Sequence, residues 1–131
     1  MSSSSEESVM RGVLARALLN LLRFEKPYSD SVFVGVLLDE QSNAAHHMEH
    51  LEKVALSIGL EPTRVRRSYG AELFELEPGR RIVFFNRRTG GRQIRGESMD
   101  VLYAPASFMT PDRYEELYPA LMVRDGNVEL Y

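Results

Sequence analysis

The sequence contains no cysteine, so neither a disulfide nor a thiolate site is available to it. This absence suits a reducing compartment, and we expect an intracellular protein that is not secreted. No apolar run is long enough to span a bilayer, and the Ser/Glu-rich first residues are unlike a signal peptide. A chain of 131 residues is the size of one domain, which we predict over 1–131 with 1–8 as a flexible tail.

Acidic side chains are absent from residues 79–96, although the whole chain carries a net charge of -3. This segment holds six arginines, and four of them (Arg87, Arg88, Arg92 and Arg95) are interspersed with glycines. Arginines on a glycine-rich loop are typical of phosphate contacts, so this loop is predicted to bind nucleic acid, with DNA as the expected partner. In the alternative interpretation, Arg80 and Arg81 pair with acids of the preceding strand and the other arginines are solvated.

Acids, bases and thiols are also absent from residues 101–111, where a short apolar strand ends at a proline. In open α/β sheets, ligands bind at the carboxyl ends of the strands. This strand end therefore has the position of an active site without the side chains for one.

The alternation of patterns along the chain predicts an α/β fold. Helices are expected over 9–24, over 44–58 and from Pro111, and strands over 31–38, 64–69, 71–77, 81–86, 101–104 and 122–131. The continuous apolar run 31–38 is typical of a strand buried on both faces, and the helix after it indicates a parallel sheet. The turn dipeptide Pro78-Gly79 predicts an antiparallel hairpin.

One short motif suggests a metal. His46, His47, Glu49 and His50 match H-x-x-E-H, the helical signature of a class of zinc proteases, and two histidines four residues apart can share a metal ion. A catalytic zinc needs a third protein ligand, and no neighbouring segment supplies one. We therefore expect a solvated helix face and no metal, and keep a metallohydrolase using His46, Glu49 and His50 as a weaker alternative.

Three segments, in order, resemble a known family. Arg81-Ile82-Val83-Phe84, Ile94-Arg95-Gly96 and Asp100-Val101-Leu102-Tyr103 resemble the ATPase domain of the large terminase subunit, the motor that packages DNA into phage and herpesvirus capsids. Tyr118-Pro119-Ala120-Leu121 is similar to the segment that follows in that family. The resemblance implies a P-loop NTPase-like three-layer α/β sandwich with a mostly parallel sheet and an inserted antiparallel hairpin.

The chain departs from this family at the nucleotide site. Aligned with the phosphate-binding loop G-x-x-x-x-G-K-[ST], Ser8 takes the hydroxyl position, Glu7 the lysine position and Glu6 the second glycine position. An acid in the lysine position repels phosphate. The Asp-Glu pair that holds magnesium falls on Ala104-Pro105 or Pro105-Ala106, neither of which supplies a carboxylate.

The resemblance and the departures together predict a degenerate and incomplete terminase ATPase domain that lacks the first core strand. We expect no catalytic residue and no cofactor, and binding of DNA through the basic loop. The alternative is an interaction or regulatory module that docks on a packaging motor, capsid protein or other viral component. The expected compartment is the cytoplasm or the nucleus of a host cell, without a membrane partner.

Overall fold

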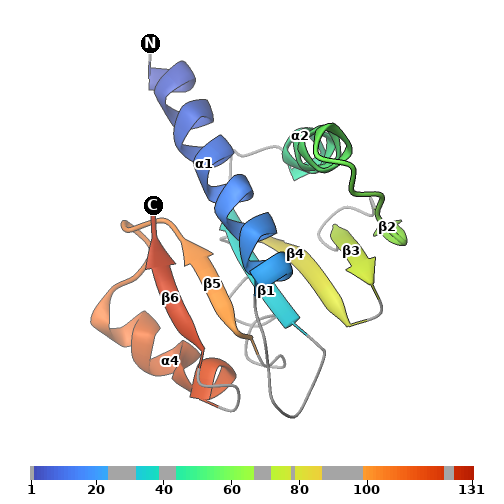
Figure 1. Cartoon of the computed structure of the whole chain (residues 1–131). Coiled ribbons are helices and arrows are strands. Elements are labelled where there is room, and N and C mark those ends of the chain that lie inside the picture. Colours follow the sequence, from blue (N-terminus) through green and yellow to red (C-terminus); the bar gives the residue numbers. More distant parts are fainter. Residues whose placement is uncertain are drawn as a thin grey trace.

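The computed structural model of the chain describes residues 2–23, 32–38, 44–66, 72–77, 79–86, 99–122 and 126–131. Six strands form one sheet in the order β2-β3-β4-β1-β5-β6 (Figure 1). The strands are β1 (Val32–Leu38), β2 (Arg64–Arg66), β3 (Leu73–Glu77), β4 (Arg80–Asn86), β5 (Val101–Ala104) and β6 (Asn127–Leu130). The helices are α1 (Ser2–Arg23), α2 (Ala44–Ser57) and α4 (Pro111–Met122).

The centre of the sheet is parallel, as the sequence predicted. Strand β1 pairs in parallel with β4 on one side and with β5 on the other, and β5 pairs in parallel with β6. All seven residues of β1 are buried, because helices cover both faces of the sheet here. A side chain at Gly35 in its middle would meet the Met99 sulfur at 2.6 Å, so glycine is required by close packing.

The remaining two strands form the predicted antiparallel part. Strands β3 and β4 pair as a hairpin, and β2 adds to the free side of β3. Gly79 in the turn has a φ of 89°, a left-handed conformation that glycine adopts without a steric penalty. The prediction of a mostly parallel sheet with an inserted antiparallel hairpin is confirmed.

Two apolar cores make the molecule a three-layer α/β sandwich (Figure 1). On one face, α1 and α2 cover β1, β3, β4 and β5, with Leu14, Leu18 and Leu51 among the fully buried side chains. On the other face, Phe33 and Leu37 of β1 pack with Leu117 of α4. The three-layer α/β sandwich implied by the resemblance is therefore present.

Helix α1 begins earlier than the sequence indicated. We predicted a polar tail over 1–8 and a helix from Val9, whereas the helix is continuous from Ser2. Glutamate is a good helix former and serine is only mildly unfavourable, so residues 2–8 extend the helix that the apolar face of residues 10–21 anchors. Buried Met10, Val13 and Leu21 form part of that face, whereas Val9 and Leu22 are 47% and 45% exposed.

The ends of the other two helices are well defined. Helix α2 is closed by Gly59, with a φ of 80°, and by hydrogen bonds from Gly59 N to the Leu56 oxygen and from Leu60 N to the Ala55 oxygen. Helix α4 extends to Met122, so the predicted strand over 122–131 is wrong at its first residue, and β6 (Asn127–Leu130) lies within the predicted range. No helix within the described residues is long and apolar enough to cross a membrane.

Candidate functional site

The candidate site is the edge of the sheet where the parallel strands β1, β5 and β6 end. Helix α1 crosses one face antiparallel to these strands, and its N-terminal half reaches this edge (Figure 1). The chain leaves β1 toward α2 on one face and leaves β5 toward α4 on the other. Ligands of open α/β sheets bind where neighbouring connections diverge in this way.

Ala104 and Pro105, predicted to stand where the family's magnesium-binding carboxylates lie, are at this edge. Ala104 is the last residue of β5 and is fully buried in the core beneath α4, and Pro105 is also buried. Ala106 and Ser107 follow and are exposed. The described end of β5 thus presents no carboxylate to bind a metal ion or to activate a water molecule.

Tyr131 lies at the same edge, where the sequence predicted no role for it. Its backbone extends β6 along β5, donating from N to the Ala104 oxygen at 3.0 Å and accepting from Ala106 N at 2.9 Å. Its hydroxyl donates to the Leu37 carbonyl near the end of β1. Because the backbone is bonded to β5 and the hydroxyl to β1, the side chain bridges the two strand ends where a ligand would enter. Tyr131 is the last residue of the strand predicted over 122–131, and that position carries no sequence signal for this contact.

Glu6, Glu7 and Ser8, the residues aligned with a phosphate-binding loop, lie in α1. In a helix that begins at Ser2, the N–H groups from the second turn onward donate to carbonyls four residues earlier. The three amides are therefore engaged within the helix, whereas a phosphate-binding loop needs its amides directed at the ligand. Ser8 is exposed.

The four arginines of the predicted nucleic-acid surface, Arg87, Arg88, Arg92 and Arg95, lie outside the described residues. The two arginines before them are described. Arg80 donates to the Leu21 carbonyl at the C-terminal end of α1, and the Arg81 guanidinium lies 4.3 Å from the centre of the Phe33 ring. In the ladder Arg80 and Arg81 stand opposite Glu77 and Glu75. Both therefore have structural partners, whereas their pairing with the acids of the preceding strand stays a prediction.

The zinc-protease motif lies on α2. Glu49 is exposed and pairs with Lys53 at 3.3 Å. Within the described part of the chain, no group of three His, Cys, Asp or Glu side chains is arranged to hold a metal ion. The expected third ligand for His46 and His50 is thus not found among these residues.

A half-buried polar cluster joins α1 to the sheet beside the candidate edge. The Tyr103 hydroxyl accepts a hydrogen bond from the Asn20 amide, and Arg16 lies 5.6 Å from the centre of the Tyr103 ring. Arg16 also pairs with Glu129 of β6 at 3.6 Å. Burial raises the pKa of Tyr103 to about 12, and Glu129 contributes, while Arg16 and Asn20 act in the opposite direction. Tyr103 is therefore neutral near pH 7 and serves to position α1 on β5 and β6.

Comparison with known proteins finds similarity in structure alone. No protein-family model matches the chain, and no curated protein matches it. The fold is similar to that of the large terminase from the thermophilic bacteriophage D6E, with a TM-score of 0.54 at 11% identity over 89% of this chain and 27% of that chain. The same terminase in complex with ADP has a TM-score of 0.54 at 10% identity, over 89% of this chain and 28% of that one. At this identity the likeness establishes a terminase-like fold, and this chain spans little more than a quarter of those chains.

Proposed function

We propose that this chain is a domain of viral DNA-packaging origin that binds nucleic acid and does not hydrolyse ATP. The observation that carries the proposal is the end of β5. In a terminase-like fold, the position expected to hold magnesium is occupied by buried Ala104 and Pro105, and Tyr131 bridges the adjacent strand ends. Hydrolysis of a phosphoanhydride needs a metal ion and an oriented water, and neither residue can supply a ligand to them.

The phosphate-binding side of the site supports the same conclusion. The amides of Glu6, Glu7 and Ser8 are engaged in α1, and two of these three residues bring a negative charge to a position that would have to accept phosphate. We infer that the fold has been retained for binding after its nucleotide chemistry was lost.

Nucleic-acid binding is assigned to the loop arginines Arg87, Arg88, Arg92 and Arg95. Arg80 and Arg81 contact α1 and Phe33, so no ligand contact is assigned to these two arginines. Each arginine that meets a phosphate releases counterions, so affinity for DNA should fall with salt at a logarithmic slope of about -0.9 per contact.

The test is the salt dependence of binding to a single-stranded and a duplex oligonucleotide, measured by fluorescence anisotropy. The R92A/R95A variant should have a less steep salt dependence, by the equivalent of about two phosphate contacts. The matched control is R64A/R66A, which removes the same charge from two exposed arginines on edge strand β2. Wild-type protein that ignores both oligonucleotides at low salt would refute nucleic-acid binding, and equal losses in both variants would refute the loop as its site.

A second function is favoured by a different observation. Within the described residues β6 is an edge strand, and Leu130 on it is 44% exposed. On α4, Tyr114, Tyr118 and Met122 follow at intervals of four residues and are 41%, 60% and 59% exposed. Apolar side chains beside an unpaired strand suit a protein partner, and the proposed partner is a packaging motor or capsid protein. Salt-insensitive binding to a purified large terminase or portal protein, weakened by Y118D and unchanged by R92A/R95A, would favour this module.

A further inference from the structure

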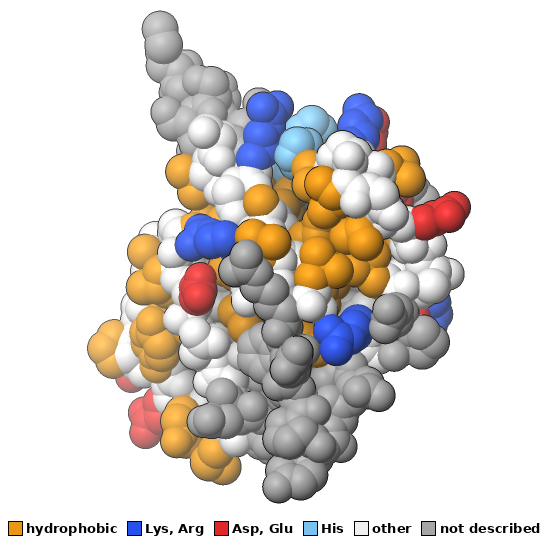
Figure 2. Space-filling model, viewed as in Figure 1, with side chains coloured by type: hydrophobic (Ala, Val, Ile, Leu, Met, Phe, Trp, Pro, Cys, Tyr) orange, Lys and Arg blue, Asp and Glu red, His pale blue; other side chains and the backbone are white. Residues whose placement is uncertain are grey.

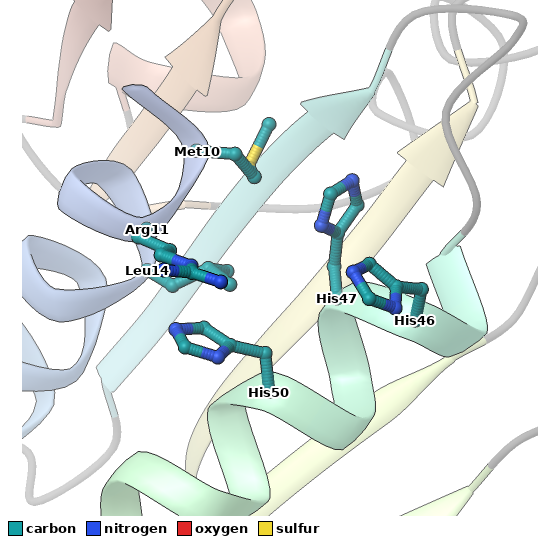
Figure 3. Close-up of a pocket in the computed structure, with 6 residues that line it drawn as sticks. All are labelled: Met10, Arg11, Leu14, His46, His47 and His50. Atoms are coloured by element: carbon teal, nitrogen blue, oxygen red, sulfur yellow. The ribbon is translucent and has the colours of Figure 1, made fainter. Parts of the chain in front are cut away.

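The hollow between α1 and α2 is too small to receive part of another molecule. It is lined by Met10, Arg11, Leu14, His46, His47 and His50 (Figure 3). Its volume of about 10 Å³ leaves room for roughly one water molecule. A side chain of a partner does not fit into this space, so the surface best suited to a partner lies elsewhere, at the edge of the sheet.

The outer edge of β6 has backbone groups available for pairing. Within the described residues β6 is the last strand of the sheet, and no strand pairs with its outer side (Figure 1). Asn127 N and Tyr131 N donate to backbone carbonyls along β5, at 3.1 and 3.0 Å. Because backbone groups alternate in direction along a strand, the N–H and C=O groups of Val128 and Leu130 point away from β5. Such an edge is a template on which another strand can pair.

The side chains of β6 divide into an apolar and a polar face. Val128 packs into the core beneath α4, and Leu130, on the same face, is 44% exposed. On α4, which covers this face, Tyr118 is 60% exposed. On the other face, Glu129 pairs with Arg16 of α1 at 3.6 Å. Figure 2 shows apolar side chains at the surface on the side of the molecule where β6 and α4 lie. A strand added here therefore needs apolar side chains toward α4 and polar ones toward α1.

We propose that β6 pairs antiparallel with β6 of a second copy of the chain, so that the sheets of the two copies become continuous. Such pairing rests on the second function proposed above, the use of this edge by a protein, and the occupant it names is the chain itself. Strand β6 has the required pattern, because Val128 and Leu130 face α4 and Glu129 faces α1. A two-fold axis perpendicular to the sheet brings each face of one copy beside the same face of the other.

Hydrogen bonding selects one register. With Glu129 opposite Glu129 of the second copy, Val128 of each copy lies opposite Leu130 of the other. Each of these two pairs exchanges both N–H···O bonds, so all the outward groups of Val128 and Leu130 are satisfied. A register with Val128 opposite Val128 would place Leu130 opposite Gly126. The Gly126 N–H already donates to the Leu121 carbonyl at 2.8 Å, so this second register would lack a donor.

The charges at the edge are compatible with this register. Like charges directly opposite each other destabilise a sheet, and the two Glu129 carboxylates meet at the two-fold axis. Each carboxylate has its own Arg16 guanidinium at 3.6 Å, so two cations accompany the two anions. On the α4 face, each Val128 gains contact with the exposed Leu130 of the other copy.

The first experiment uses single cysteines, which report the register because the chain contains no other cysteine. In the proposed pairing the two Cα atoms of residue 129 lie about 4.5 Å apart, within the range that a disulfide bridges. The matched control is residue 127, which points to the same face of β6 but lies roughly 13 Å from its counterpart. With oxidised glutathione as the oxidant, E129C should form a covalent dimer at least about tenfold faster than N127C.

The second experiment measures the dimer of the cysteine-free protein by analytical ultracentrifugation. The mass of the wild type should rise from one chain to two with concentration. L130K places a lysine in each Val128–Leu130 pair, as natural edge strands do to prevent pairing, and should weaken the dimer at least about tenfold. The matched control is L19K, because Leu19 is 43% exposed on α1, and it should change the dimer less than about twofold. The Tm of each variant checks that it is folded.

Wild-type protein that remains a single chain up to about 0.5 mM would overturn the self-pairing. If that monomer nevertheless binds a purified large terminase or portal protein, and L130K abolishes the binding, the second proposed function stands without the self-pairing. A dimer that L130K leaves unchanged, or equal rates of cross-linking for E129C and N127C, would also overturn the pairing through β6.

Discussion

Removal of the Tyr131 hydroxyl tests whether this side chain bridges the ends of β1 and β5. The Y131F variant loses the hydrogen bond to the Leu37 carbonyl and keeps the ring, so it should lower the free energy of unfolding by about 1 kcal/mol. For a domain of this size that corresponds to a fall in Tm of about 4 °C. Y131A also loses the apolar contact of a partly buried ring with the core beneath α1 and α2. It should therefore lower the free energy of unfolding by about 2–3 kcal/mol in total.

Tyr118 provides the matched control, because it is 60% exposed on α4. Y118F and Y118A should each change the free energy of unfolding by less than about 0.5 kcal/mol. Urea denaturation followed by circular dichroism measures all four variants against the wild type. If Y131F is as stable as Y118F, the hydroxyl does not stabilise the contact with β1, and the bridging role of Tyr131 is wrong.

Three further predictions concern other parts of the fold. The raised pKa of Tyr103, about 12 against 10 in the unfolded chain, means that its contribution to stability is complete below pH 10 and is lost as the pH rises from 10 toward 12. A titration of tyrosinate absorbance should accordingly show a late step that Y103F abolishes. Gly126→Ala places a Cβ 2.2 Å from the Met99 carbonyl oxygen and should destabilise the protein by about 2–4 kcal/mol. Gly12→Ala, at an exposed position of α1 with nothing within 4 Å of the added Cβ, should stabilise it by about 0.5–1 kcal/mol. Equal melting temperatures for these two variants would contradict the packing of β6 on β5. Addition of a chelator should leave Tm unchanged, and a loss that zinc restores would instead support a metal at His46 and His50.

The elements that were predicted correctly are those with an unambiguous apolar period. Strand β1 is apolar at every position except Gly35, and Gly79 indicates the turn of the hairpin. Both the strand and the hairpin can therefore be predicted from the local sequence. The start of α1 was not predicted correctly. Residues 2–8 have no apolar period, and their helical conformation depends on the anchored turns that follow them. The boundary between α4 and β6 was missed for a similar reason, since Leu121 and Met122 suit either element.

The candidate site, like the fold, could be predicted from the sequence only in part. The absence of carboxylates at Ala104 and Pro105 could be read from the sequence once the strand end was located. The contact of the Tyr131 hydroxyl with Leu37, 94 residues away, depends on strand order, which no local pattern contains. The gathering of the histidines against Arg11 likewise needs α1 and α2 to pack side by side.

The central claim is that a terminase-like fold has here lost its nucleotide site, and titration calorimetry with magnesium-ATP tests it most directly. Wild-type protein should give no saturable heat of binding up to millimolar ATP. Y131A should behave in the same way, because opening the edge restores neither the carboxylates absent at Ala104 and Pro105 nor the amides engaged in α1. A saturable, magnesium-dependent site of micromolar affinity in the wild-type protein would contradict this account.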